Sequence, residues 1–179
     1  MSVHAFVDES RRNDTYFLAA AIVQVKDLDM LRTRLKGLLL PGQRELHFRR
    51  EKPARRRLIL SRLVDLGVQV DIYRAGCRAG EEEARQRCLA RLVEDLLDIR
   101  TSRLVLDSRA GRDKFDRLTI RRVLGKQAKE SWLSHEHFDS TGEPLLWIAD
   151  MVLGCHGLGG DWTRRTAPAV GSVVRLEDP

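Results

Sequence analysis

The sequence predicts a single α/β domain, built on a mixed β-sheet with helices on both faces. Two strand-like segments open the chain, and strand-like and helix-like segments then alternate along most of it. One strand-like segment, residues 103–107 (RLVLD), has an uninterrupted apolar centre, which is typical of a strand covered on both faces. With 179 residues and 42% hydrophobic content, the chain can bury one substantial core and has little room for a second. We therefore interpret residues 1–179 as one domain, with its core at about 3–157 and a tail at 158–179.

The first half of the chain begins with a predicted hairpin. Residues 4–8 (HAFVD) and 15–25 (TYFLAAAIVQV) are rich in apolar, aromatic and β-branched side chains, and the polar residues 9–14 between them suit a turn. Leucines at helical spacing, followed by a Pro-Gly pair, predict a helix over 27–40. By the same criteria, the next elements are a helix at 53–66 and an alternating strand at 68–75.

The second half contains the most regular predicted helix, residues 81–100. Its apolar pairs recur every four residues, and its acidic first turn complements the helix dipole. The remaining expected elements are the buried strand 103–107, a helix at 114–127, an alternating strand at 132–138 and a buried helix at 144–155 that glycines 157, 159 and 160 end. The tail from Asp161 is expected to add a β-strand or to form a flexible arm.

Composition limits the compartment and the partners. The chain carries 32 Lys and Arg against 26 Asp and Glu, a formal net charge of +6, which favours a polyanionic partner without naming one. Its three cysteines lie far apart and form neither a disulfide framework nor a zinc pattern, so a reducing compartment is expected. No segment approaches the ~18 to 20 apolar residues of a membrane span, and acidic residues stand where a signal peptide would have its apolar core. We expect a cytoplasmic protein with no membrane partner.

The positive charge is concentrated between residues 44 and 62. This segment holds eight basic and two acidic residues, so its net +6 equals that of the whole chain. One interpretation is an ordinary solvated helix face; the other is a surface that contacts phosphates and displaces counterions. On the second interpretation, the expected nucleic-acid contacts are Arg49, Arg50, Lys52, Arg55 and Arg56.

Three carboxylates stand where charge is unexpected. Asp8 and Asp107 each end an apolar strand, and α/β proteins usually build their sites at the carboxyl ends of strands. Asp150 is the only ionisable side chain of 144–155 apart from Cys155, and a buried lone carboxylate is costly unless a cation or donors compensate it. Each has an ordinary explanation by itself: a solvated strand end for Asp8, a turn or helix cap for Asp107, and an arginine partner for Asp150.

Taken together, the three carboxylates favour a metal site. Two acids on adjacent strands and one on a packing helix can converge, and a bound divalent cation is the usual remedy for their repulsion. Oxygen ligands without a supporting set of cysteines favour Mg²⁺ or Mn²⁺ over structural zinc. Such a site can hold two ions ~4 Å apart that activate water and stabilise the leaving oxygen in phosphodiester cleavage. An acidic metal site beside a basic surface is the combination that a nuclease needs.

The motifs FVDES followed by YFLAAAIV, then ELHF, LVLDSR and FDSTGEPLLWIADMVLG, occur in this order from Val3 to about Gly157. They resemble the successive motifs of the family labelled domain of unknown function 3800, which is assigned to the ribonuclease H-like superfamily. The resemblance implies a ribonuclease H-like fold and the two-metal carboxylate cluster of that superfamily. The metal ligands it implies are Asp8, Glu45, Asp107 and Asp150, with His47 and Glu9 as auxiliaries. The chain departs from the family pattern at Arg11, where glycine is common, and at Trp147, where glutamine is usual; neither change removes an implied ligand.

Several other residues keep more than one interpretation. His47 lies two residues from Glu45, so in an extended chain it would share that face as a metal ligand or as a proton carrier near neutral pH. His135 and His137 would point to one strand face, as a metal pair, as exposed strand histidines or as side chains that interact with phosphate. Glu9 would be the solvent-facing neighbour of Asp8 if it is not an auxiliary.

The leading hypothesis is a divalent-metal-dependent nuclease, with Asp8, Glu45, Asp107, Asp150 and His47 as the catalytic set. One alternative is a non-catalytic nucleic-acid-binding or interaction module of the same fold, associated with defence or mobile elements. Another is a hydrolase of small phosphoesters. The nucleic acid could be RNA, DNA or a hybrid, and the oligomeric state, including a homodimer, stays open.

Overall fold

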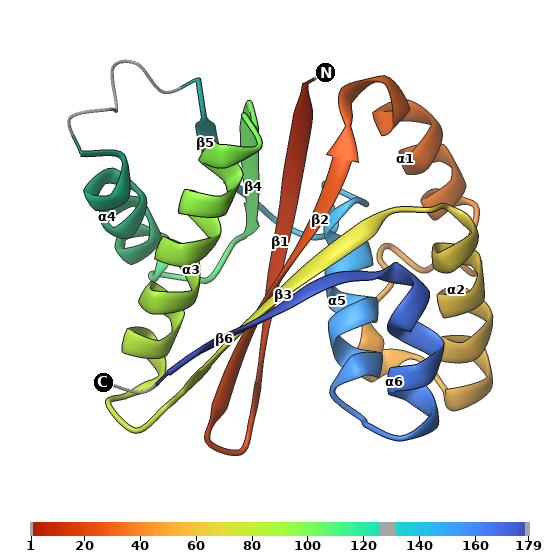
Figure 1. The fold of residues 1–179 in the computed structure, drawn as a ribbon. Helices are drawn as coiled ribbons and strands as arrows, with labels where there is room; N and C mark the ends of the chain where they lie inside the picture. The colour runs from red at the N-terminus through yellow and green to blue at the C-terminus, as the bar shows by residue number, and fades with distance from the viewer. Residues whose placement is uncertain (1, 126–131, 178–179) are drawn as a thin grey trace.

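A computed structural model describes residues 2–125 and 132–177 of the chain. Its centre is a six-stranded sheet with the order β5-β4-β1-β2-β3-β6 (Figure 1). The strands are β1 (Val3–Arg12), β2 (Thr15–Gln24), β3 (Gln69–Gly76), β4 (Arg103–Asp107), β5 (Ser134–Phe138) and β6 (Val170–Leu176).

The sheet is mixed. Strands β1, β2 and β3 form an antiparallel meander, whereas β4 and β5 extend the sheet beyond β1 in parallel and β6 extends it beyond β3 in parallel. Helices cover both faces, so the α/β class with a mixed sheet is confirmed.

The helices divide into two layers (Figure 1). The layer of α3 and α4 packs on one face, and the layer of α1, α2, α5 and α6 packs on the other. The helices are α1 (Leu28–Lys36), α2 (Pro53–Asp65), α3 (Glu81–Asp98), α4 (Asp113–Leu124), α5 (Leu146–His156) and α6 (Asp161–Thr166). Three short 3₁₀ segments, η1 (Val25–Asp27), η2 (Phe48–Arg50) and η4 (Ala167–Ala169), connect them.

Each face of the sheet has its own apolar core, and β1 contributes to both. Because strand side chains alternate, Phe6 packs into the core under α5, whereas Ala5 and Val7 pack into the core under α3. The same alternation places Asp8 on the α5 face and Glu9 on the α3 face.

The predicted hairpin is correct, but its first strand is longer than expected. Residues 9–12 continue β1 and pair with 15–18 of β2, so only Asn13 and Asp14 form the turn. Asn13 has a φ of 50°, a left-handed conformation that asparagine tolerates better than most residues. Polar side chains in 9–12 suggested a loop, but they face the cavity and the ion-pair network described below.

The helix predicted over 27–40 is shorter in the structure. Helix α1 ends at Lys36 because Gly37, a poor helix former, follows it as the C-cap. Leu38 and Leu39 still pack against the core, from the turn after the helix. The spacing of these two leucines therefore indicates burial in the core and not a longer helix.

The tail adds a strand to the sheet, which was one of the two expectations for the residues from Asp161 on. After Gly157, the C-cap of α5, the chain forms α6 and then β6, which pairs with β3. The flexible-arm alternative is therefore wrong for residues 161–176.

The other predicted elements match the structure closely. The strand 103–107 is found with the same bounds, and most ends of the others differ by two residues or fewer. The predicted end of the helix 114–127 lies outside the described residues. Among the described residues, no helix combines the length and the apolar character needed to cross a membrane.

Candidate metal site

A cavity of about 490 Å³ opens where β1 and β4 meet the loop before η2 and the middle of α5. All five residues expected to form the catalytic set line it: Asp8, Glu45, His47, Asp107 and Asp150. The carboxylates come from four separate parts of the chain, so only the tertiary fold brings them together.

Asp8 and Asp107 reach the cavity from adjacent parallel strands. The residues before them, Val7 and Leu106, are partners in the β1–β4 pairing. Asp8 and Asp107 therefore lie next to each other on neighbouring strands. The carboxylate of Asp8 accepts the N–H of Glu9 at 2.7 Å. No described residue forms an ion pair with Asp8 or Asp107.

Asp150 holds the segment before α2 against α5. Its Oδ2 accepts the backbone N–H of Phe48 at 2.6 Å and lies 3.8 Å from Nδ1 of His47. The Phe48 ring packs directly on Gly154, where a Cβ would come within 2.2 Å of the ring. No described arginine forms an ion pair with Asp150, so the arginine-partner explanation is wrong for the described part of the chain.

Among the four carboxylates of the expected catalytic set, Glu45 is the one that pairs with a described arginine. It pairs with Arg50 at 2.9 Å and accepts a hydrogen bond from the hydroxyl of Ser140. Ser140 is fixed in turn, because its carbonyl accepts the indole N–H of Trp147 at 2.7 Å. Sequence reasoning missed Ser140, although it stands in one of the quoted motifs, and treated Trp147 only as a departure.

Burial raises the pKa values of three of the cavity acids, Asp8, Asp107 and Asp150. Burial, with Asp150, Glu9 and Asp107 close by, raises the pKa of Asp8 well above its ordinary range. Burial and neighbouring carboxylates, Glu9 first among them, raise the pKa of Asp107 to about 7. Burial also raises the pKa of Asp150, although the Phe48 N–H and His47 oppose it. The charged forms are therefore disfavoured unless a cation compensates them.

Three arginines form the basic part of the cavity wall. Arg12 donates to the carbonyl of Gly154 at 2.8 Å, and Arg56 donates to the carbonyl of Phe48 at 2.9 Å with its guanidinium 4.1 Å from the centroid of the Phe48 ring. Arg49 also lines the cavity. Sequence reasoning missed Arg12 because it ended the first strand at Asp8, whereas residues 8, 10 and 12 of a continuing strand share one face.

The other predicted phosphate contacts do not line the cavity. Arg50 is 71% exposed and bound to Glu45. Arg55 is committed to the carbonyl of Leu38 and lies 3.7 Å from the buried Glu51, so it is not free for phosphate. Lys52 is exposed beside α2. The basic segment therefore divides into cavity residues, structural residues and solvated residues.

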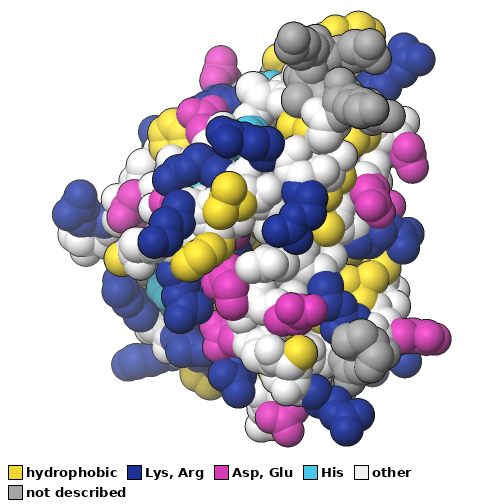
Figure 2. Space-filling view, turned by 90° about the vertical axis from the view of Figure 1, so that its left-hand side faces the viewer, with side chains coloured by type: hydrophobic (Ala, Val, Ile, Leu, Met, Phe, Trp, Pro, Cys, Tyr) yellow, Lys and Arg dark blue, Asp and Glu magenta, His cyan; other side chains and the backbone are white. Residues whose placement is uncertain are grey.

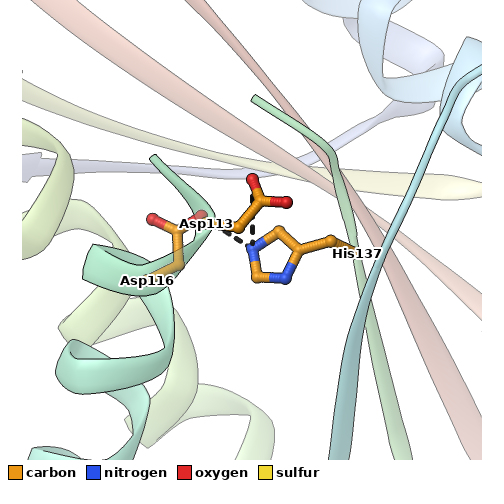
Figure 3. A group of neighbouring side chains, drawn as sticks. All are labelled: Asp113, Asp116 and His137. Atoms are coloured by element: carbon orange, nitrogen blue, oxygen red, sulfur yellow. Dashed lines mark hydrogen bonds and ion pairs between the residues drawn. The ribbon is translucent and has the colours of Figure 1, made fainter. Parts of the chain in front are cut away.

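A second group of potential ligands lies on the opposite face of the sheet (Figure 3). Ligand atoms of Asp113, Asp116 and His137 lie within 4.8 Å of one another, so the group could hold a metal ion. No other three His, Cys, Asp or Glu side chains of the described residues meet this spacing, so the cavity carboxylates are spread more widely.

Arg85 competes with a metal ion at this second group. It is fully buried, and its Nε and Nη2 each donate to an oxygen of Asp116 at 2.7 Å. His137 lies 3.0 Å from Asp116 as well, so the expectation of exposed strand histidines is wrong for His137. Any metal ion there would have to displace or lie beside a guanidinium.

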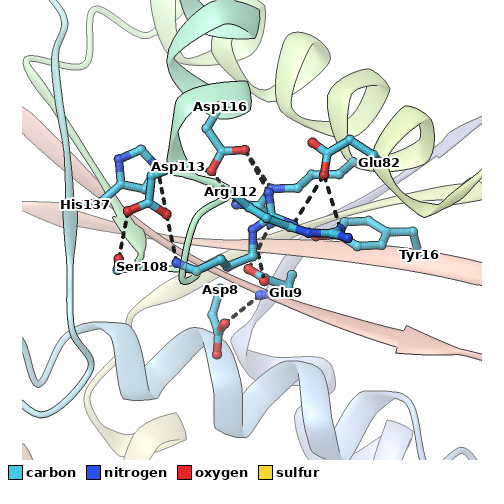
Figure 4. Close-up of polar contacts among 11 residues, drawn as sticks. Asp8, Glu9, Tyr16, Glu82, Ser108, Arg112, Asp113, Asp116 and His137 are labelled. Atoms are coloured by element: carbon cyan, nitrogen blue, oxygen red, sulfur yellow. Dashed lines mark hydrogen bonds and ion pairs between the residues drawn. The ribbon is translucent and has the colours of Figure 1, made fainter.

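Glu9 belongs to the same network (Figure 4). Arg85 contacts Glu9 at 2.8 Å and the hydroxyl of Tyr16 at 2.6 Å, and Arg109 approaches Glu9 and Asp116. Figure 4 shows Asp8 directed towards α5, away from this network. The expectation of a solvent-facing Glu9 is therefore wrong: Glu9 joins an ion-pair network that packs behind Asp8.

Comparisons with known proteins agree with the fold. The chain is similar to RNase HII in the PCNA:RNase HII complex from Archaeoglobus fulgidus, with a TM-score of 0.55, 15% sequence identity, and coverage of 84% of this chain and 70% of that chain. The structure therefore has a ribonuclease H-like fold. No family model matches the sequence, and no curated protein matches it either.

Proposed function

We propose that this protein is a divalent-metal-dependent nuclease that hydrolyses phosphodiester bonds. The observation that carries the proposal is the convergence of Asp8, Glu45, Asp107 and Asp150 on one cavity that three arginines also line. The ribonuclease H-like fold supports it by analogy alone, because one fold can host unrelated functions.

The donor set of the cavity fits Mg²⁺ or Mn²⁺. Its ligand atoms would be carboxylate oxygens, which these hard cations prefer. Asp8 and Asp107 lack ion-pair partners among the described residues, and the pKa values of Asp8, Asp107 and Asp150 are raised. A divalent cation would supply the missing compensation. Once bound, two such ions would activate water and stabilise the leaving oxygen.

The other cavity residues would bind and orient the substrate. Arg12, Arg49 and Arg56 would hold the phosphates of a nucleic acid beside the carboxylates, as charge-assisted hydrogen bonds from guanidinium to phosphate commonly do. Phe48 and Gly154 fix two of these arginines, since Arg12 and Arg56 donate to their carbonyls. His47, 36% exposed at the cavity, would exchange a proton with solvent.

The test is a cleavage assay with protein stripped of metal by EDTA. Labelled single-stranded, duplex and hybrid oligonucleotides are incubated with Mn²⁺, Mg²⁺ or no added ion. We expect cleavage only with a divalent ion, and a loss of more than about 100-fold in Asp8→Asn, which removes a ligand while keeping the shape of the side chain.

Asp98→Asn is the matched control, because Asp98 is exposed at the end of α3, which packs on the face of the sheet opposite the cavity. The control variant should cleave as the unaltered protein does. Full activity in EDTA, or in Asp8→Asn, would contradict the proposal.

We also propose that the chain is a divergent member of the family labelled domain of unknown function 3800. The support is the position of its motif acids, since Asp8, Glu45, Asp107 and Asp150 all line the same cavity.

A further inference from the structure

A row of four residues crosses the sheet from the cavity to its far edge. Ser10 of β1 is the partner of Phe17 on β2, Phe17 of Arg74 on β3, and Arg74 of Arg175 on β6. Directly opposed residues of neighbouring strands share a face. Ser10 lies two residues after Asp8 and lines the cavity, so the row begins at the acidic site and lies on the same face.

The far end of this row is a second hollow with an excess of positive charge. Its volume is about 540 Å³, and its lining includes Arg74, Arg78 and Arg175 with one carboxylate, Asp14. None of these three arginines forms an ion pair with a described residue. Arg74 lies over the ring of Phe17, with 5.5 Å between the guanidinium carbon and the ring centroid. The one carboxylate can offset only one of the three positive charges, so the hollow keeps a net positive charge that favours an anionic ligand.

The row has the length to follow a polymer. Neighbouring strands lie about 4.8 Å apart, so three strand steps from Ser10 to Arg175 span roughly 15 Å. A mononucleotide or a small phosphoester in the cavity would not reach the arginines at the far edge. A nucleic-acid strand with a phosphodiester bond in the cavity would extend along the row.

We propose that Ser10, Phe17, Arg74 and Arg175, together with Arg78, form a track that binds the nucleic-acid strand flanking the phosphodiester bond to be cleaved. The arginines contact its phosphates, and the half-buried ring of Phe17, which packs against the core, supports the guanidinium of Arg74. The inference rests on the proposed function and narrows it, because it names a polymeric strand rather than a small phosphoester as the substrate.

The experiment compares binding of a short and a long probe. Fluorescence anisotropy measures the affinity of a labelled dinucleotide and of a labelled single strand of about 20 nucleotides, both in the Asp107→Asn background so that cleavage does not interfere. Adding Arg74→Ala and Arg175→Ala together should weaken binding of the long strand about tenfold. The slope of log affinity against log salt should also become shallower by about 1.4, or about 0.7 for each phosphate that the variant no longer neutralises. The weakening should grow with the length of the strand.

The control is the pair Arg117→Ala and Arg121→Ala on α4. Both side chains are exposed and lie on the opposite face of the sheet, where Lys and Arg side chains are mixed with acidic ones (Figure 2). This pair removes the same charge and should leave the binding of both probes close to that of the background.

Two outcomes would overturn the track: equal losses of affinity from the two arginine pairs, or an equal loss for the dinucleotide and the long strand. Cleavage is measured separately in the unaltered protein. Selective loss of long-strand binding in a protein that cleaves nothing with any divalent ion would support the track and contradict the nuclease. Normal cleavage with no selective loss would support the nuclease and overturn the track.

Discussion

Two carboxylate-rich regions lie back to back across strand β1, and they balance their charge in opposite ways. They begin at consecutive residues, Asp8 on the α5 face and Glu9 on the α3 face. Behind the sheet, Arg85 and Arg109 neutralise Glu9 and Asp116. In front of it, Asp8 and Asp107 have no ion-pair partner among the described residues.

The pKa values record this difference. The hydrogen bonds and charge of Arg85, with His137, overcome the effect of burial and hold the pKa of Asp116 well below its ordinary value. Burial and neighbouring acids push the pKa of Asp107 up to about 7. Proximity of carboxylates is therefore a weak indicator of a metal site by itself, and the absence of a protein cation beside them is a stronger one.

The largest expected effect concerns the neutralised side. Arg85→Met should lower the free energy of unfolding by about 3–5 kcal/mol, because it leaves Asp116 and Glu9 without their buried partner. Urea denaturation measures the change. Arg91→Met on the same helix is the control: Arg91 pairs with Asp95 at the surface, where solvent screens the pair, so its loss should change the free energy of unfolding far less. Equal effects of the two substitutions would show that the buried network contributes little.

The next effect distinguishes the two regions as metal sites. Asp107→Asn should weaken Mn²⁺ binding more than about 100-fold, whereas Asp113→Asn should leave it almost unchanged, because Arg85 already occupies the neighbouring Asp116. Isothermal titration calorimetry measures both affinities. The reverse ranking would move the metal site to Asp113, Asp116 and His137.

The smallest effect is a pH dependence of stability without metal. Asp107 has a folded-state pKa of about 7 against an ordinary 3.8, so the unfolded chain loses this proton first. Between these values the folded state binds more protons, and the free energy of unfolding falls as pH rises. The raised pKa of Asp8 acts with the same sign. The lowered pKa of Asp116 acts in the other direction and only below its ordinary value, so it does not interfere in this window.

Thermal unfolding in EDTA should therefore give a lower Tm at about pH 8 than at about pH 5, by about 2–4 °C for each kcal/mol lost. Asp107→Asn should reduce this difference. The lowered pKa values of His4, His135 and His156 act in the opposite direction, and equally in both proteins, so the comparison decides. The same pH dependence of Tm in the unaltered protein and in Asp107→Asn would contradict the raised pKa of Asp107.

Much of the fold could be predicted because regular elements leave local patterns. The apolar run of 103–107 and the four-residue repeat of 81–100 specify a strand and a helix within about two residues of where they lie. The length of β1 could not be predicted, because residues 9–12 are all polar, and the three of them that are partly buried owe this to partners far along the chain. The sequence left the tail open between a strand and a flexible arm, because the partner of β6 is β3, which lies far along the chain.

The cavity residues were predictable in part. Asp8, Asp107 and Asp150 stand out because each interrupts an apolar pattern, whereas Glu45 came only from the family resemblance. The sequence interpretation overlooked Arg85, although its position is unusual for a charged residue. It precedes Cys88 and Leu89 by three and four residues, so it lies on the apolar stripe of α3. Its partners come from β1, β2 and α4, and no local pattern identifies them.

The pairing of β6 with β3 has a consequence for how the chain folds. Val170 joins Val70 in this pairing, so the sheet gains its outermost strand only after nearly all the other elements have been synthesised. Until then β3 presents an open edge, and unpaired edges promote association with other chains. Shielding of this edge until residues 170–176 have been synthesised would therefore govern the yield of native protein.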